Sequence, residues 1–153
     1  NGPIHQSFRV PKMTQVTITQ EQLLAMPASD YMSAPQLAFF KALLLNRKAK
    51  LQELLSDRAE TLRGESDNRL PDIADTASVE EQRSMELRML QRYQSELKEI
   101  GGALERIEEE SYGWCEQTGA EISLQRLLVA PTASLCVDAQ ETLERRAQHQ
   151  RVA

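Results

Sequence analysis

Two cysteines late in the chain have the spacing of residues that hold zinc. Cys115 and Cys136 each open a short turn, and a four-cysteine zinc site would place a second cysteine three residues after each of them. Those two positions hold Thr118 and Ala139. Structural zinc takes four thiolate or imidazole ligands, and neither a threonine hydroxyl at neutral pH nor a methyl group replaces a thiolate. The pattern predicts a degenerate zinc site that holds no metal.

No histidine completes the set of ligands. His149 falls far along the last expected helix, and His5 falls in residues 1–12, which precede Met13 and which we expect to be vector-derived. Packing of apolar side chains must then hold the segment together. The side chains expected in this core are Trp114, Leu124, Leu127, Leu128, Leu135 and Val137.

Two long helical patterns precede these turns. From residue 34, apolar residues recur at intervals of three and four, which marks one face of a helix, although Arg47 and Arg58 interrupt the series. A second such pattern ends near residue 110, and Gly101 and Gly102 within it predict either a tolerated weak point or a hinge. The apolar positions are Leu37, Phe40, Leu44, Leu51, Leu54, Leu55 and Leu62, then Leu90, Tyr93, Leu97, Ile100, Leu104 and Ile107.

The stretch "RGESDNRLPDIADTAS" between the two patterns is rich in residues that favour turns, including Gly64, Pro71 and three aspartates. Two long helices joined by a short polar loop fold back as an antiparallel coiled-coil hairpin.

The sequence therefore predicts an all-α or mainly α fold with a long antiparallel coiled-coil hairpin on a small globular base. The hairpin covers residues 34–110, with its tip near 64–77. Residues 13–33 form an N-terminal segment that packs on the base. Residues 111–153 hold the degenerate zinc-finger region and a C-terminal helix.

The composition excludes several classes of function. The chain has 18 basic and 23 acidic residues and a formal net charge of −5, whereas general binding to nucleic-acid backbones needs basic surface. No apolar run approaches the roughly 18 residues of a membrane span, and no secretory signal pattern is present. We expect a cytoplasmic protein that neither binds nucleic-acid backbones in general nor associates with membranes.

The quoted residues resemble the DksA/TraR family of transcription regulators. "YGWCEQTGAEI", the "RL" that follows it and "PTASLC" resemble the zinc-finger region of that family, and "EEQRSMELR" fits its second helical arm. "PDIADTAS" resembles the D-x-x-D-x-A motif at the tip of its coiled coil and places Asp72, Asp75 and Ala77 at the functional positions. The resemblance covers about residues 31–148 and is that of a DksA paralogue without the four-cysteine zinc site.

This resemblance implies a protein that is not an enzyme, that does not read DNA sequence and that binds bacterial RNA polymerase. The coiled coil would enter the secondary channel of the polymerase, where Asp72 and Asp75 act near the catalytic magnesium, and Arg88 and Arg92 would contact the polymerase. It also implies a role in the stringent response with the alarmone ppGpp: lower transcription from ribosomal RNA promoters and higher transcription from some amino-acid biosynthesis promoters. A form without zinc would suit zinc starvation.

The expected response to ppGpp is weak. The basic residues that help the family hold ppGpp correspond here to Glu99, Ala130 and Gln140. Loss of positive charge weakens binding of a polyphosphate. Lys98 and Arg126 remain as cations that could compensate in part.

Two other functions remain open. A transcript-cleavage factor resembling the GreA/GreB type also carries acidic residues at a hairpin tip, but such factors place the globular domain after an N-terminal hairpin and lack the cysteine turns. A structural coiled-coil adaptor would instead pair its helices with those of a partner protein. Capture of RNA polymerase separates the two regulators from the adaptor, and cleavage of stalled transcripts separates the regulators from each other.

Overall fold

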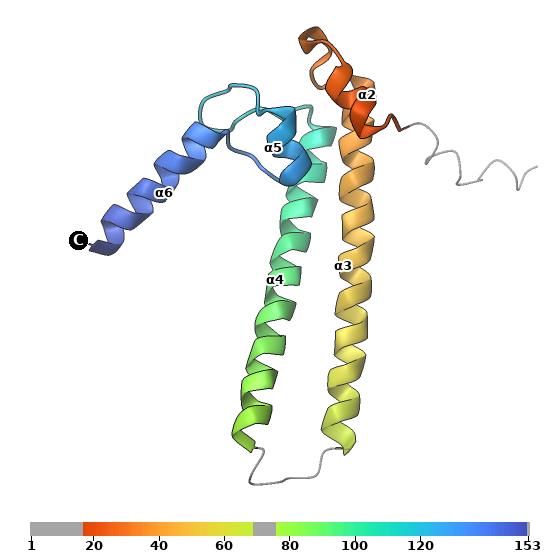
Figure 1. The fold of residues 1–153 in the computed structure, drawn as a ribbon, viewed down its shortest axis with the longest axis vertical. Coiled ribbons are helices and arrows are strands. Elements are labelled where there is room, and N and C mark those ends of the chain that lie inside the picture. Colours follow the sequence, from red (N-terminus) through yellow and green to blue (C-terminus); the bar gives the residue numbers. More distant parts are fainter. Residues whose placement is uncertain (1–16, 69–75, 153) are drawn as a thin grey trace, which may run out of the picture. The chain divides into compact units, whose positions relative to one another are not determined.

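The structure is a computed structural model that describes residues 17–68 and 76–152. Its elements are α2 (Gln20–Ala25), the 3-10 helix η2 (Ala28–Asp30), α3 (Ala34–Asn68), α4 (Thr76–Glu108), α5 (Leu124–Val129) and α6 (Val137–Val152) (Figure 1). Within these residues the only extended pairing is an isolated antiparallel bridge between Trp114 and Glu121. No helix in the described ranges is long and apolar enough to cross a membrane. The predicted mainly α fold, with two long helices packed as a hairpin, is confirmed.

The chain divides into two compact units. Unit 1 contains the described residues up to Leu44 and those from Ala103 onward, and unit 2 contains Leu45–Gly102. The helices α3 and α4 each contribute to both units. In unit 1, Phe40 and Leu44 are fully buried, so the first turns of the long α3 helix belong to the globular core.

Two ion pairs join the antiparallel arms of unit 2. Arg47 donates two hydrogen bonds to Glu96, of 2.6 and 3.0 Å, and Arg58 Nη1 lies 2.9 Å from Glu86 Oε1. The later arginine pairs with the earlier glutamate, as antiparallel helices require. The two arginines that interrupt the apolar pattern of α3 are therefore cross-arm partners.

The Arg47–Glu96 pair makes the stability of unit 2 depend on pH. The hydrogen bonds from Arg47 lower the pKa of Glu96 below its ordinary value. A carboxylate whose pKa is depressed in the folded state stabilises the fold above its unfolded pKa, and this stabilisation is lost as the pH falls through the folded value. Because both side chains are partly exposed to solvent, the contribution stays below about 1 kcal/mol.

Glu96→Gln should lower the melting temperature by a few degrees at about pH 7 and by less near pH 2, because the stabilisation by the wild-type carboxylate is lost as it takes up a proton. The control is Glu99→Gln, because Glu99 is exposed on the same helix. Thermal unfolding followed by circular dichroism at both pH values is the measurement. An equal loss at the two values would show that the pair does not set the pH dependence.

The connection between the arms is shorter than the predicted 64–77. Helix α3 continues through Gly64 and ends at Asn68, and α4 begins at Thr76. A glycine within a helix costs only about 1 kcal/mol relative to alanine, which a long helix tolerates. For the same reason α4 runs unbroken through Gly101–Gly102.

Candidate functional site

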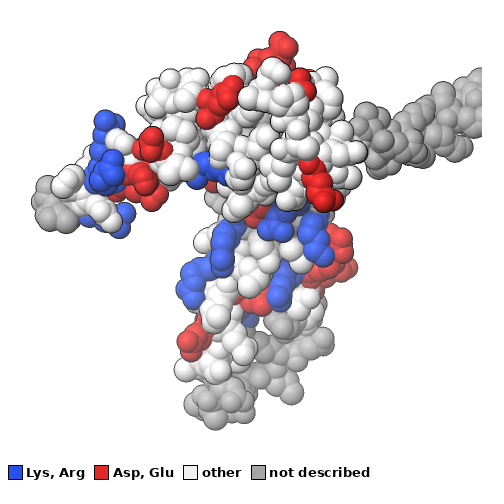
Figure 2. Space-filling model, turned by 45° about the horizontal axis from the view of Figure 1, so that its top comes forward, with Lys and Arg blue, Asp and Glu red and all other residues white. Residues whose placement is uncertain are grey.

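The residues expected at the tip of the hairpin are only partly described. Asp72 and Asp75 fall between α3 and α4, outside the described residues, so their roles stay predictions. Ala77 lies in the first turn of α4 and is exposed. Arg88 and Arg92 are exposed on the same helix, about one helical turn apart. Figure 2 shows basic and acidic side chains interspersed on one face of the molecule, without a continuous basic patch over that face.

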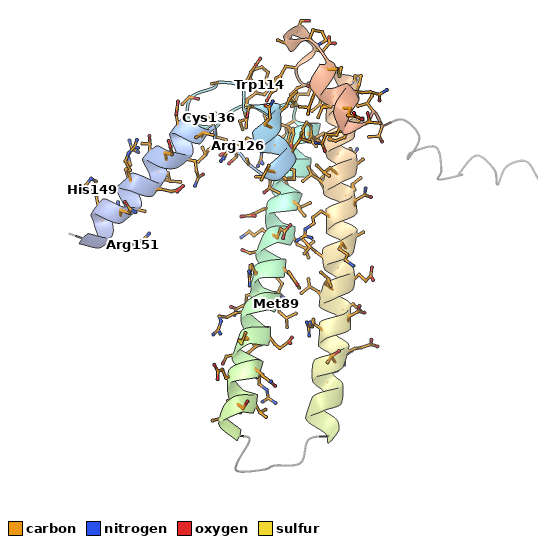
Figure 3. The ribbon with its side chains drawn as sticks, viewed as in Figure 1. Met89, Trp114, Arg126, Cys136, His149 and Arg151 are labelled. Carbon is orange, nitrogen blue, oxygen red and sulfur yellow. The ribbon has the colours of Figure 1, made fainter. Side chains whose placement is uncertain are left out.

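Three of the four degenerate zinc positions come together in unit 1. Thr118 Oγ1 lies 3.8 Å from Cys136 Sγ, and Cys115 lies in the same turn as Thr118, closed by the bond from Gly119 N–H to the Cys115 carbonyl oxygen. Cys136 directly precedes α6 (Figure 3), and Ala139 lies in the first turn of that helix. Both cysteines are free thiols. The Thr118 hydroxyl thus links the first turn to the cysteine of the second.

Cys115 is buried, and the pKa of its thiol is lower than usual. The side chain of Thr118 lowers the pKa of the Cys115 thiol to about 6; burial opposes this shift, and the backbone N–H groups of Cys136, Thr118 and Gln117 add to it. The backbone of Cys115 is fixed as well, because its N–H donates to the carbonyl oxygen of Ala120 over 2.8 Å. The turn around Cys115 is therefore closed by hydrogen bonds of the chain itself.

A tyrosine from the N-terminal segment holds this first turn together. The Tyr31 hydroxyl lies 2.7 Å from the carbonyl oxygen of Gly113 and also within hydrogen-bond distance of that of Ile122. Burial raises the pKa of Tyr31 to about 12, helped by the nearby Glu121, so the hydroxyl stays protonated and remains a donor. Residues 17–33 therefore help to close the turn from outside.

The second turn is held in the same way by side chains that donate to backbone carbonyl oxygens. Its segment between α5 and α6 carries no regular backbone pairing of its own, so each such bond satisfies an acceptor that would otherwise lack a partner. The three donors are Tyr112 Oη on Pro131 (2.7 Å), Arg106 Nη2 on Thr132 (3.1 Å) and Arg126 Nε on Leu135 (2.9 Å). A backbone bond from Glu116 N–H to the Ser134 carbonyl, of 2.9 Å, joins this segment to the first turn.

The core around the turns differs in part from the predicted one. Leu127 is fully buried, but Trp114 is 38% exposed and Val137 is 51% exposed. Trp114 packs edge-on against Tyr31 with ring centroids 5.4 Å apart, and so large a side chain is rarely buried completely. Leu124, Leu128 and Leu135 are partly buried, and the core also contains Tyr112, Cys115 and Ile122.

This set of donors does not fit zinc. The four positions offer two thiols, one hydroxyl and one methyl group, whereas structural zinc needs four thiolate or imidazole ligands. Over residues 17–68 and 76–152, no group of three or more His, Cys, Asp or Glu side chains is placed to hold a metal ion. His149 is exposed far along α6, as the sequence predicts.

Three positions correspond to the basic residues with which the family is expected to hold ppGpp, and none of them carries a positive charge in this chain. In unit 2, Glu99 is exposed beside the exposed Lys98. In unit 1, Ala130 is the C-cap of α5 and Gln140 lies in α6. Arg126 already uses its Nε to hold a backbone carbonyl. The one cation expected to compensate in unit 1 is thus partly committed to the fold.

Residues 36–107 match the family described as DnaK suppressor protein DksA, N-terminal domain, and residues 110–145 match the prokaryotic dksA/traR C4-type zinc finger. The RNA polymerase-binding transcription factor DksA of Caulobacter vibrioides (strain NA1000 / CB15N) is 41% identical over 139 residues, which cover 88% of this chain and 95% of that protein. The protein of the same name from Escherichia coli (strain K12) is 36% identical over 118 residues, which cover 77% and 78%.

A solved structure is also similar to this chain. The structure of transcription factor DksA2 from Pseudomonas aeruginosa aligns with a TM-score of 0.75 at 44% sequence identity, covering 86% of this chain and 100% of that one. The similarity in sequence and fold therefore includes both long helices and the degenerate zinc turns.

Proposed function

Because the chain belongs to the DksA family, we propose that it is a transcription regulator that binds bacterial RNA polymerase and is not an enzyme. The observation that carries this proposal is the extent of the similarity. Relatives named RNA polymerase-binding transcription factor match 88% of the chain at 41% identity, across the coiled coil and the zinc-finger region alike. A partner in transcription would put the protein in the cytoplasm.

The hairpin is the part that would reach the active centre through the secondary channel. The 33 residues of α4 span about 50 Å at the rise of an α-helix. In unit 2 the Arg47–Glu96 and Arg58–Glu86 pairs join the two arms, which favours a narrow, rod-like coiled coil. Such a rod can enter a channel that excludes a globular domain.

Asp72 and Asp75 would act at the end of this rod, near the catalytic magnesium, and change the stability of the open complex. Ala77, in the exposed first turn of α4, leaves room for a close approach because its side chain is small. Arg88 and Arg92 are exposed on α4 and would contact the polymerase along the channel. Ribosomal RNA promoters would be inhibited and some amino-acid biosynthesis promoters activated.

The protein would act without zinc. The four side chains that donate to carbonyl oxygens of the two turns support this proposal, because they supply cross-links where a metal would otherwise tie the turns together. The same fold could then regulate transcription during zinc starvation.

We expect ppGpp to bind weakly through this protein. Labelled ppGpp, titrated onto a polymerase that lacks any other alarmone site, should show little added affinity when the protein is present. Ala130→Arg with Gln140→Lys should raise the affinity by about tenfold or more, because charge-assisted hydrogen bonds to phosphate contribute about 1.5–3 kcal/mol each. Tight ppGpp binding that depends on the unchanged protein would contradict this expectation.

The test of the proposed function is capture of RNA polymerase. The tagged full chain should retain purified core polymerase in a pull-down, and an excess of untagged chain should release it. Failure to retain polymerase would favour the structural coiled-coil adaptor. Retention together with cleavage of transcripts in stalled complexes would favour a cleavage factor resembling the GreA/GreB type.

A further inference from the structure

One flank of α4 carries a stripe in which methionines alternate with arginines. Its members stand at positions i, i+3, i+4 and i+7 of the helix and therefore lie along one side of it. They are Met85, Arg88, Met89 and Arg92. Met85 is 55% exposed, both arginines are exposed, and Met89, labelled in Figure 3, is partly buried. This Met–Arg stripe thus presents an apolar side chain and two cations to solvent.

The two arginines of the stripe have no acidic partner among the described residues. The ion pairs found there are Lys41–Glu108, Arg47–Glu96 and Arg58–Glu86. The two carboxylates of residues 82–98, Glu86 and Glu96, are therefore already paired with the other arm. Arg88 and Arg92 are also four positions apart, a spacing at which like charges destabilise a helix. The stripe holds two neighbouring positive charges that no described carboxylate neutralises.

The composition of the stripe indicates what it binds. Nucleic-acid backbones are held by dense basic patches, whereas flexible methionine side chains are typical of surfaces that bind proteins. The stripe is one side chain wide and about 10 Å long, which suits packing against a second helix. We propose that the Met–Arg stripe binds a helix of RNA polymerase that carries acidic residues beside an apolar face. The inference rests on the proposed function and adds the chemistry of the partner to it.

The members of the stripe would contribute in different ways. Met85 would lose its exposed apolar surface to the partner. Each guanidinium would donate charge-assisted hydrogen bonds to a carboxylate, which would also relieve the repulsion between Arg88 and Arg92. Leu87 is 50% exposed on the same helix, but residues two positions apart do not face the same way. It therefore lies off the stripe and provides a control of matched exposure.

The test compares variants of the full chain for affinity to purified core polymerase, by competition with the labelled unchanged chain at low and high salt. Met85→Gln should weaken binding by about fivefold, because less apolar surface is buried. Arg88→Gln with Arg92→Gln should weaken it by about tenfold and make it less sensitive to salt. Leu87→Gln, the matched control, should stay within about twofold of the unchanged chain.

Thermal unfolding separates a loss of contact from a loss of fold. The melting temperature should change by no more than a few degrees for Met85→Gln, whose side chain is exposed. It should not fall for the double arginine variant, because that variant removes two like charges four positions apart.

Three results would overturn the inference and leave the proposed function standing. The first is equal affinity of Met85→Gln and Leu87→Gln for polymerase. The second is an unchanged salt dependence in the double arginine variant, which would mean that the partner is not acidic. The third is self-association of the chain, seen by sedimentation and abolished by Met85→Gln, which would place a second copy on the stripe. Failure of the unchanged chain to bind polymerase would instead remove the proposed function and the inference together.

Discussion

Replacing both Asp72 and Asp75 with asparagine should abolish the effect on transcription and leave binding to RNA polymerase intact. The two substitutions preserve side-chain size and remove two negative charges between α3 and α4. They leave the ion pairs of unit 2 and the hydrogen bonds of unit 1 unchanged, so the melting temperature should shift by no more than a few degrees. At the proposed place near the catalytic magnesium, each carboxylate would act through its charge on a divalent cation, and asparagine removes that charge.

The measurement is the lifetime of the open complex at a ribosomal RNA promoter, together with polymerase affinity by competition. A matched control removes two charges from exposed positions of α3, Glu53→Gln with Asp57→Asn. The control should shorten the lifetime of the open complex as the unchanged protein does, and the tip variant should not. Full activity of the tip variant would show that the two aspartates do not carry the effect.

Adding two cysteines, Thr118→Cys with Ala139→Cys, should convert the degenerate turns into a zinc site. The unchanged protein should be isolated with less than about 0.2 zinc per chain, and the variant with about one. Binding of structural zinc is coupled to folding, so EDTA should lower the melting temperature of the variant and leave that of the unchanged protein where it was.

The control for this conversion is Thr118→Ser with Ala139→Ser, which alters the same positions without adding a thiolate. Elemental analysis of all three proteins, purified side by side, gives the result. One tightly held zinc in the unchanged protein would mean that ligands other than the four aligned positions complete a site, and zinc-independent action would have to be abandoned.

The arms of the hairpin could be predicted because their signal is local. Apolar residues at intervals of three and four place α3 and α4 close to where the structure has them. Arg47 and Arg58 first read as interruptions, and their partners become visible only when the two arms are aligned antiparallel. Gly64 was misleading, because a single glycine is a weak signal inside so long a helix.

For the candidate site, the sequence predicts only which zinc ligands are absent. Thr118 and Ala139 predict that no four-thiolate zinc site forms, because each stands where such a site needs a cysteine. The hydrogen bonds that hold the two turns leave no recognisable pattern in the sequence. The Tyr31 hydroxyl, for example, bonds to carbonyl oxygens 82 and 91 positions away along the chain. Tyr112 was missed as a core residue because its burial depends on the Pro131 carbonyl as a partner for its hydroxyl.

The roles of the tip residues could not be predicted from periodicity or composition. Aspartates beside a proline are ordinary in a connection between helices, so their function follows only from the resemblance to the family. The structure adds that Ala77 is exposed at the start of α4.

The most direct test is the lifetime of open complexes at a ribosomal RNA promoter, measured with purified polymerase and saturating amounts of this protein. Two samples are compared, one untreated and one in which the protein has been stripped with a zinc-selective chelator that is removed before mixing. The lifetime should shorten to the same extent in both samples. An unchanged lifetime in the untreated sample would contradict action on polymerase, and a shortening that disappears after stripping would contradict action without zinc.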